Sequence, residues 1–206
     1  MQKEMDALNL LYDRQRKQYQ IARQNVQIIN RKCHELKVQI ADLRRLQPDE
    51  ATTQSLDEAE QAARMYDANA ATGNEVLDVV LTEKSLLCEA QRIRLNCVAD
   101  GTCLAAIEPG DLYALFSNLL DQAIDAAAQQ QNDRRMIDLL VCRRQGFAVI
   151  NVIGPALSGS QSDHGRRHSY ELKVARRVVQ KYSGTMATEP RGELFAVKIV
   201  MPLTRG

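Results

Sequence analysis

The feature that most constrains this chain is a stripe of mostly apolar residues that repeats at alternating three- and four-residue steps between Met5 and Leu43. A period of about three and a half residues, kept over more than three heptads, is typical of a long helix that packs along another long helix. We therefore expect the chain to form a homodimer through this segment. The residues at the a and d positions are Met5, Leu8, Tyr12, Gln15, Tyr19, Ala22, Val26, Ile29, Cys33, Leu36, Ile40 and Leu43.

A second helix is expected to start near Thr52 or Thr53 and to pass through Tyr66. It follows a break at Gln47-Pro48-Asp49, where proline cannot continue the first helix. Folded back on the first helix, it makes a hairpin, and two hairpins from two chains form a four-helix bundle. We assign residues 1–70 to this dimerisation region and residues 71–206 to a second domain.

The second domain alternates predicted helices and strands, which indicates an α+β protein whose mixed sheet follows the hairpin. Asn74 or Thr72 can cap its first helix, and Asp111 can cap its second. Alternation around Cys97 predicts a strand with that residue on the buried face. The helix over 112–129 is expected to have one apolar face, and the strands over 136–142 and 147–153 to form a hairpin through Arg143-Arg144-Gln145-Gly146. The expected elements are a helix over 76–88, strands over 92–98, 136–142 and 147–153, a helix over 112–129, a loop over 154–168, a helix over 170–182, and strands over 185–188 and 193–201.

The composition is that of an ordinary soluble protein, with 206 residues, 45% of them hydrophobic and 26% charged. A net charge of +1 gives no general attraction to nucleic acid, and no apolar run is long enough for a membrane span. The five cysteines form no CxxC pair, which favours a reducing cytoplasm over a disulfide framework or a zinc site. His164 and His168 are four residues apart, but the glycine and serines around them favour a loop over a metal site.

His34 lies on the flank of the heptad stripe, directly after Cys33 at an a position. A rigid helix can present its imidazole to another protein, and the neighbouring Glu35 can accept a ring proton or fix the tautomer. The alternative is a solvated histidine on a charged helix face.

The order of these elements and several local sequences resemble the cytoplasmic part of sensor histidine kinases, in the class of peptide-pheromone receptors. The segment Lys32-Cys33-His34-Glu35-Leu36-Lys37 is similar to the phosphoacceptor motif of that family. Residues 72–84 are similar to its linker into the nucleotide-binding domain. The second half resembles the GHKL ATPase fold, an α/β sandwich whose helices cover one face of a mixed sheet.

The first nucleotide box of the family matches residues 118–126, which makes Asn118, Asp121 and Gln122 the candidate ligands of ATP and Mg²⁺. Gln122 stands where the family has the asparagine that binds the metal, and its extra methylene moves the amide oxygen by about 1.5 Å, one carbon–carbon bond. Octahedral Mg²⁺ tolerates such a shift poorly. The alternative is an amphipathic helix on which these residues form a solvated edge.

The second box departs further from the family pattern. The family has His-Gly-x-Gly-Leu-Lys, whereas residues 168–173 have His168, Lys173 and, in place of the two glycines, Ser169 and Glu171. Glu171 would repel a phosphate by about 1 kcal/mol at a partly exposed site. The Asp-x-Gly-x-Gly box that contacts adenine is absent, and Asn151 is the nearest candidate; Gly165, Arg166 and Arg167 are possible replacement phosphate contacts.

The resemblance implies that ATP phosphorylates His34, with Glu35 as proton acceptor, and that the phosphoryl group then passes to an aspartate on a response regulator. It also implies a cytoplasmic region of a bacterial protein, joined to the membrane only through a sensor region upstream of residue 1. An alternative is a degenerate dimeric scaffold or phosphotransfer protein that does not bind ATP productively. A third is a coiled-coil structural protein without phosphoryl chemistry.

Overall fold

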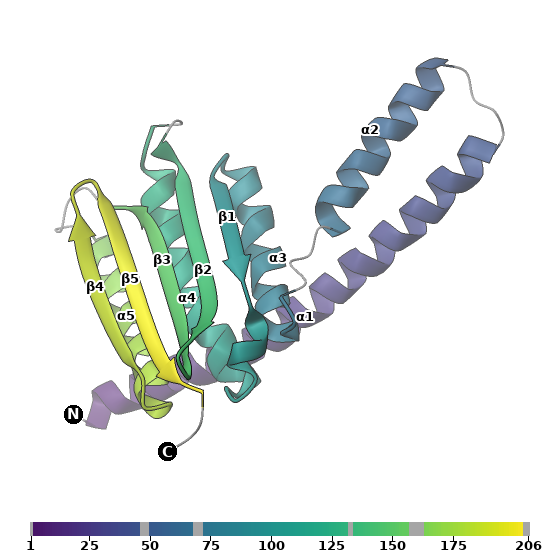
Figure 1. Cartoon of the computed structure of the whole chain (residues 1–206). Helices are drawn as coiled ribbons and strands as arrows, with labels where there is room; N and C mark the ends of the chain where they lie inside the picture. The colour runs from purple at the N-terminus through teal and green to yellow at the C-terminus, as the bar shows by residue number, and fades with distance from the viewer. Residues whose placement is uncertain (1, 46–49, 68–71, 132–133, 157–162, 204–206) are drawn as a thin grey trace.

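A long helical hairpin precedes an α/β sandwich in the computed structural model, which describes residues 2–45, 50–67, 72–131, 134–156 and 163–203 (Figure 1). This confirms the expected fold class, with helices first and a mixed sheet second. The predicted turn at residues 47–49 lies outside the described residues. The elements in order are α1 (Gln2–Arg45), α2 (Glu50–Asp67), α3 (Glu75–Ala90), β1 (Arg94–Ala99), η1 (Gly101–Leu104), α4 (Pro109–Ala128), β2 (Met136–Arg144), β3 (Phe147–Pro155), α5 (Asp163–Lys181), β4 (Thr185–Arg191) and β5 (Leu194–Pro202).

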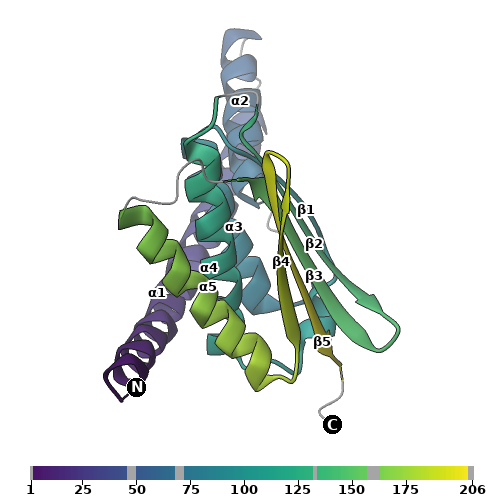
Figure 2. The same ribbon diagram turned by 90° about the vertical axis from the view of Figure 1, so that its left-hand side faces the viewer.

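The sheet has the strand order β1-β2-β3-β5-β4, in which β1 and β2 are parallel and the other pairs are antiparallel. Helices α3, α4 and α5 all lie against one of its faces (Figure 2). The hairpin between β2 and β3 is confirmed. Its turn residues Gln145 and Gly146 both have positive φ, 48° and 84°, as a two-residue turn of type I′ requires.

Helix α4 forms the centre of the core, because α1, α3, α5 and strands β2 and β3 all contact it. Its expected apolar face is confirmed as buried, and each such leucine or phenylalanine contributes about 1.5–3 kcal/mol of hydrophobic stabilisation. The fully buried side chains on this helix are Leu112, Leu115, Phe116, Leu119, Leu120 and Ile124.

Helix α1 packs on two partners along its length. Its first half lies against α3 and α4, and its second half lies along α2 (Figure 1). The ring of Tyr19 packs on that of Tyr113 with centroids 5.4 Å apart, and Ala22 and Val26 are buried beside it. Part of the heptad stripe is therefore filled within one chain, while Leu36 and Leu43 each remain 49% exposed.

The start of helix α5 corrects one expectation, because the helix begins at Asp163 inside the segment predicted to be a loop. A glycine in a helix costs only about 1 kcal/mol, so Gly165 does not suffice to stop one. Cys97 corrects another, since it is exposed rather than buried. It lies on the outermost strand, where Leu95 and Ala99 reach the core.

Asp111 is a further correction, because α4 begins at Pro109 and Glu108 occupies the N-cap position. The Asp111 side chain is instead fully buried, where it accepts hydrogen bonds from the Tyr182 hydroxyl at 2.6 Å and from Lys181 Nζ at 2.7 Å. The Glu108 backbone N–H donates to the Tyr182 hydroxyl at 2.9 Å. This cluster ties the start of α4 to the end of α5. Asn74, by contrast, caps α3 as expected, accepting from two backbone N–H groups.

Within the described ranges, none of the helices combines the length and the apolar character that crossing a membrane requires.

Candidate functional site

A cavity of about 240 Å³ lies between the second half of α4 and the inner face of strands β3 and β5. Small residues create this space, since Ala123 faces Gly154 and a β-carbon added at Gly154 would lie 3.6 Å from that of Ala123. Gln122 is the one polar side chain among the described residues that line it. The lining residues are Leu119, Gln122, Ala123, Ala126, Val152, Gly154, Pro155, Ala156, Phe195 and Val197.

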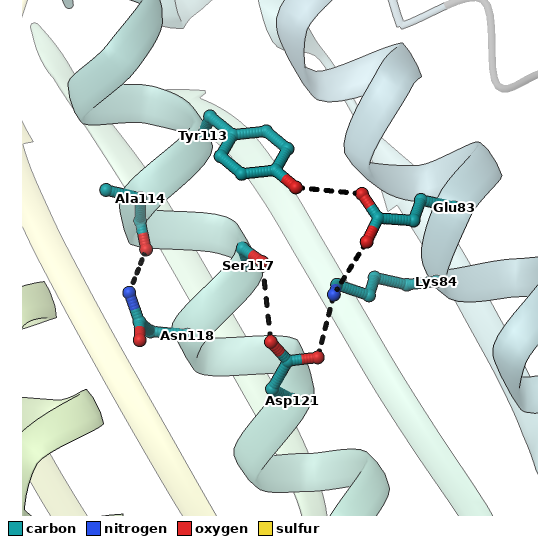
Figure 3. A network of polar contacts seen from close by, with 7 residues as sticks. All are labelled: Glu83, Lys84, Tyr113, Ala114, Ser117, Asn118 and Asp121. Carbon is teal, nitrogen blue, oxygen red and sulfur yellow. Dashed lines mark hydrogen bonds and ion pairs between the residues drawn. The ribbon is translucent and has the colours of Figure 1, made fainter. Parts of the chain in front are cut away.

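The structure separates the three polar residues that the sequence placed together on α4. Gln122 lines the cavity and is only 8% exposed. Asn118, one turn earlier, is also buried, and its amide nitrogen donates to the Ala114 carbonyl at 2.5 Å (Figure 3). Both residues are therefore more buried than a solvated helix edge would be.

Asp121 points away from Asn118, toward helix α3 (Figure 3). Its carboxylate lies 2.7 Å from Lys84 Nζ and accepts a longer hydrogen bond, 3.4 Å, from the Ser117 hydroxyl. Asp121 is not among the residues that line the cavity, so the structure does not bring its carboxylate together with Gln122 there.

Lys84 is the centre of a polar network between α3 and α4. Its side chain is only 6% exposed, and Glu83 Oε1 lies 3.3 Å from its Nζ. Burial disfavours the charged form of Lys84, but the carboxylates of Asp121 and Glu83 outweigh this and raise its pKa. Tyr113 donates to Glu83 at 2.9 Å, so the network reaches the aromatic pair with Tyr19 on α1.

Asn151 lies outside the cavity. Burial on β3 alternates, with Ile150 and Val152 on the helix-covered face, so Asn151 belongs to the opposite face of the sheet. The inner positions Val152, Gly154 and Ala156 line the cavity instead. They have the two-residue spacing of the missing Asp-x-Gly-x-Gly box, with valine in place of aspartate. This spacing was the signal that could have identified them from the sequence.

The remaining nucleotide candidates lie on α5. Lys173 is exposed. His168, Ser169 and Glu171 belong to the helix by backbone, and their side chains lie outside the described residues, as do those of the pair His164 and His168.

His34 is exposed on α1, in the part of the helix that lies along α2. The neighbouring Glu35 accepts from Lys32 Nζ at 2.7 Å and from Arg31 Nε at 3.0 Å. These two bonds, that from Lys32 first, lower the pKa of the Glu35 carboxyl group. Glu35 is therefore a weaker base than an isolated glutamate.

The described residues offer few ligands for a metal. No three His, Cys, Asp or Glu side chains among them lie close enough together to hold an ion. The amide oxygens of Asn118 and Gln122 are neutral ligands, whereas Mg²⁺ is bound mainly through carboxylates, phosphates and water. These residues fit a magnesium ion only where triphosphate and water supply most of its coordination.

Comparison with known proteins agrees with this architecture. Residues 107–202 match the GHKL domain family. No protein with a curated description matches the chain. The fold is similar to that of the catalytic domain of histidine kinase ThkA, with 16% identity over 64% of this chain and 93% of that one and a TM-score of 0.50.

Two longer histidine kinase structures are also similar. The Acinetobacter baumannii histidine kinase AdeS has 15% identity over 83% of this chain and 98% of that one, with a TM-score of 0.47. The histidine kinase domain of the blue-light activated kinase from Erythrobacter litoralis has 15% identity over 87% of this chain and 94% of that one, with a TM-score of 0.42.

Residues 107–202, which include most of the α/β sandwich, therefore resemble the GHKL domain family. The fold of this part of the chain is similar to that of a histidine kinase catalytic domain.

Proposed function

We propose that this chain is the cytoplasmic kinase part of a two-component signalling protein, which uses ATP to phosphorylate His34 and passes the phosphoryl group to a response regulator. The observation that carries the proposal is one chain that holds both a GHKL domain, with a cavity between α4 and the sheet, and an exposed histidine on a long helix. ATP occupies that cavity, and Asn118 and Gln122 contact it from α4.

In the proposed reaction a ring nitrogen of His34 attacks the γ-phosphorus, the new N–P bond forms, and the bond to the leaving oxygen of ADP breaks. The proton on the other ring nitrogen leaves to Glu35. Because Arg31 and Lys32 stabilise the charged form of Glu35, this proton transfer is less favourable than to an unpaired carboxylate. When bound with the nucleotide, Mg²⁺ neutralises phosphate charge.

The position of the domain on α1 adds a condition to this reaction. The domain contacts α1 around Ala22 and Val26, and the cavity is lined by none of the α1 side chains that the structure describes. Val26 precedes His34 by eight residues, about 12 Å along a helix. The α/β domain must therefore move along helix α1 to reach His34 of its own chain, or phosphorylate His34 of a second copy in a homodimer. The half-exposed Leu36 and Leu43 supply apolar surface for such a dimer.

Labelling with ATP that carries a radioactive γ-phosphate tests the proposal. We expect an acid-labile label on the wild-type chain, its transfer to a response regulator, and no label on His34→Ala. A label on His34→Ala would contradict the assignment of His34.

Two observations favour the alternative of a scaffold or phosphotransfer protein. The cavity has Val152 where aspartate is expected, and Asp121 is paired with Lys84. If this alternative holds, the chain takes no label from ATP, whereas a phosphorylated response regulator still labels His34.

A further inference from the structure

The outer face of the sheet, formed by the side chains of β1–β5 that point away from the helices, is largely apolar. Helices α3, α4 and α5 cover the inner face, and none of the described helices lies on the outer one (Figure 2). A sheet face that meets water usually carries polar residues. Here five large apolar side chains on this face are more than a third exposed, namely Val98, Met136, Leu140, Phe147 and Leu194.

Smaller, partly exposed side chains join these residues into one patch. Cys142 on β2 is level with Val149 on β3, and Val149 is level with Val200 on β5. All three are partly exposed, as is Ile153 further along β3. The apolar surface therefore crosses the three central strands without a break, which is typical of a face that another protein covers.

Charged side chains of both signs flank the patch on each side. Arg94 and Asp138 lie on the outer face of β1 and β2, and Lys198 and Glu189 lie on that of β5 and β4. Strand β3 is at the centre of the order β1-β2-β3-β5-β4. Because each half of the face carries both signs, a partner with a single sign of charge would leave half of these groups without an opposite charge.

We propose that a second copy of this chain covers the outer face, with the two sheets packed face to face about a two-fold axis along β3. Because β3 is the central strand, this axis lays β5 of one copy over β2 of the other, and β4 over β1. Antiparallel sheets pack in this way at a separation of about 10 Å.

The strand registers bring opposite charges together in this arrangement. Lys198 is level with Leu140, because both pair with residue 151 of β3. It therefore lies over Leu140 of the second copy, and Asp138 of that copy is two residues, about 6.6 Å, further along the strand. This separation is within reach of a lysine side chain.

A second charge pair follows from the same symmetry. Glu189 is level with Asn96 through the pairs that cross the sheet at residues 138, 153 and 196. It therefore lies over Asn96 of the second copy, and Arg94 of that copy is two residues further along β1. The two-fold axis repeats both charge pairs.

The area of the face is sufficient for such a dimer. Five strands with the usual spacing and rise cover about 600 Å². Two copies then bury about 1,200 Å², at the lower end of the range for stable protein interfaces. Neither α1 nor α2 takes part, so the inference does not rest on the proposed function.

Sedimentation equilibrium of the full chain tests the inference by charge reversal. We expect the wild-type chain to self-associate and Lys198→Glu to weaken this association at least 10-fold, because the substitution places like charges together twice in a two-fold interface. Lys198→Glu combined with Asp138→Lys restores opposite charges and should recover most of the affinity. Arg176→Glu, exposed on α5 on the other side of the sheet, makes the same change of charge and is the matched control.

Association through α1 is a separate step that Lys198→Glu leaves in place. If both contacts form, the wild-type chain reaches tetramers and Lys198→Glu stops at dimers. Self-association that Lys198→Glu leaves unchanged, or that the charge-swapped variant does not recover, would overturn the inference and leave the face to a different protein. A wild-type chain without self-association would overturn it as well.

Cross-linking of the wild-type chain tests the arrangement without a substitution. A carbodiimide joins a lysine amine to a carboxylate that contacts it. In a mixture of unlabelled and ¹⁵N-labelled chains, we expect mass spectrometry to find Lys198 of one chain joined to Asp138 of the other. The absence of any such mixed cross-link to Lys198 in the associated protein would contradict the two-fold packing along β3.

Discussion

The ion pair between Lys84 and Asp121 leads to an asymmetric prediction about stability. The two charges are 2.7 Å apart, but they differ in their access to water, because the Lys84 side chain is 6% exposed and that of Asp121 is 38% exposed. Removing one partner of a buried pair is costly when the remaining charge cannot be hydrated. The two single substitutions therefore should not cost the same.

Asp121→Asn leaves the buried ammonium with only the 3.3 Å contact to Glu83 among the described carboxylates. We expect a loss of about 2–3 kcal/mol, below the roughly 3–5 kcal/mol of a fully buried pair because Glu83 compensates in part. Lys84→Met leaves the Asp121 carboxylate, which reaches water and accepts a hydrogen bond from Ser117. We therefore expect this variant to lose only about 1 kcal/mol of unfolding free energy. The double variant removes both charges and should be more stable than Asp121→Asn alone.

Urea unfolding followed by circular dichroism at neutral pH measures all three variants. Asp125→Asn, on the same helix and partly exposed, is the matched control and should stay within about 0.5 kcal/mol of the wild-type chain. The reasoning is refuted if Lys84→Met costs as much as Asp121→Asn, or if the double variant loses the sum of the two.

Two further predictions concern pH and the contact with α1. Burial raises the pKa of the Cys88 thiol from 9.0 to about 11, so its stabilising contribution is present below pH 9 and is lost as the pH rises toward 11. The unfolding free energy of the wild-type chain, measured by urea titration, should fall by about 2–3 kcal/mol over this pH range. The difference in unfolding free energy between the wild-type chain and Cys88→Ala should therefore shrink. A difference that stays constant would contradict this prediction. Tyr19→Ala removes the aromatic pair with Tyr113 and should cost about 1–2 kcal/mol, with faster hydrogen exchange in residues 15–26 than in residues 33–45. Uniform exchange along α1 would refute an independent docking contact.

Periodicity and local signals were sufficient for much of the fold. The apolar face of α4, the cap at Asn74 and the hairpin at Gln145-Gly146 are local properties, and the structure confirms them. The start of α5 was missed because glycine weakens a helix without forbidding it.

The candidate site depended more on tertiary neighbours. Spacing shows that Asn118 and Gln122 share a helix face, but it does not show that α3 supplies Lys84 as a partner for Asp121. On a strand, a shift of one residue moves a side chain to the other face of the sheet. This is why Asn151, chosen as the nearest polar residue, lies outside the cavity and Val152 lines it.

In the proposed function, a nucleotide bound between α4 and the sheet supplies the phosphoryl group that reaches His34. Labelling with γ-phosphate tests it most directly when the wild-type chain is compared with Gly154→Leu, which fills the cavity. Circular dichroism first establishes that this variant is folded. We expect a label at His34 in the wild-type chain and none in Gly154→Leu. A label of equal extent at His34 in the folded variant would contradict it.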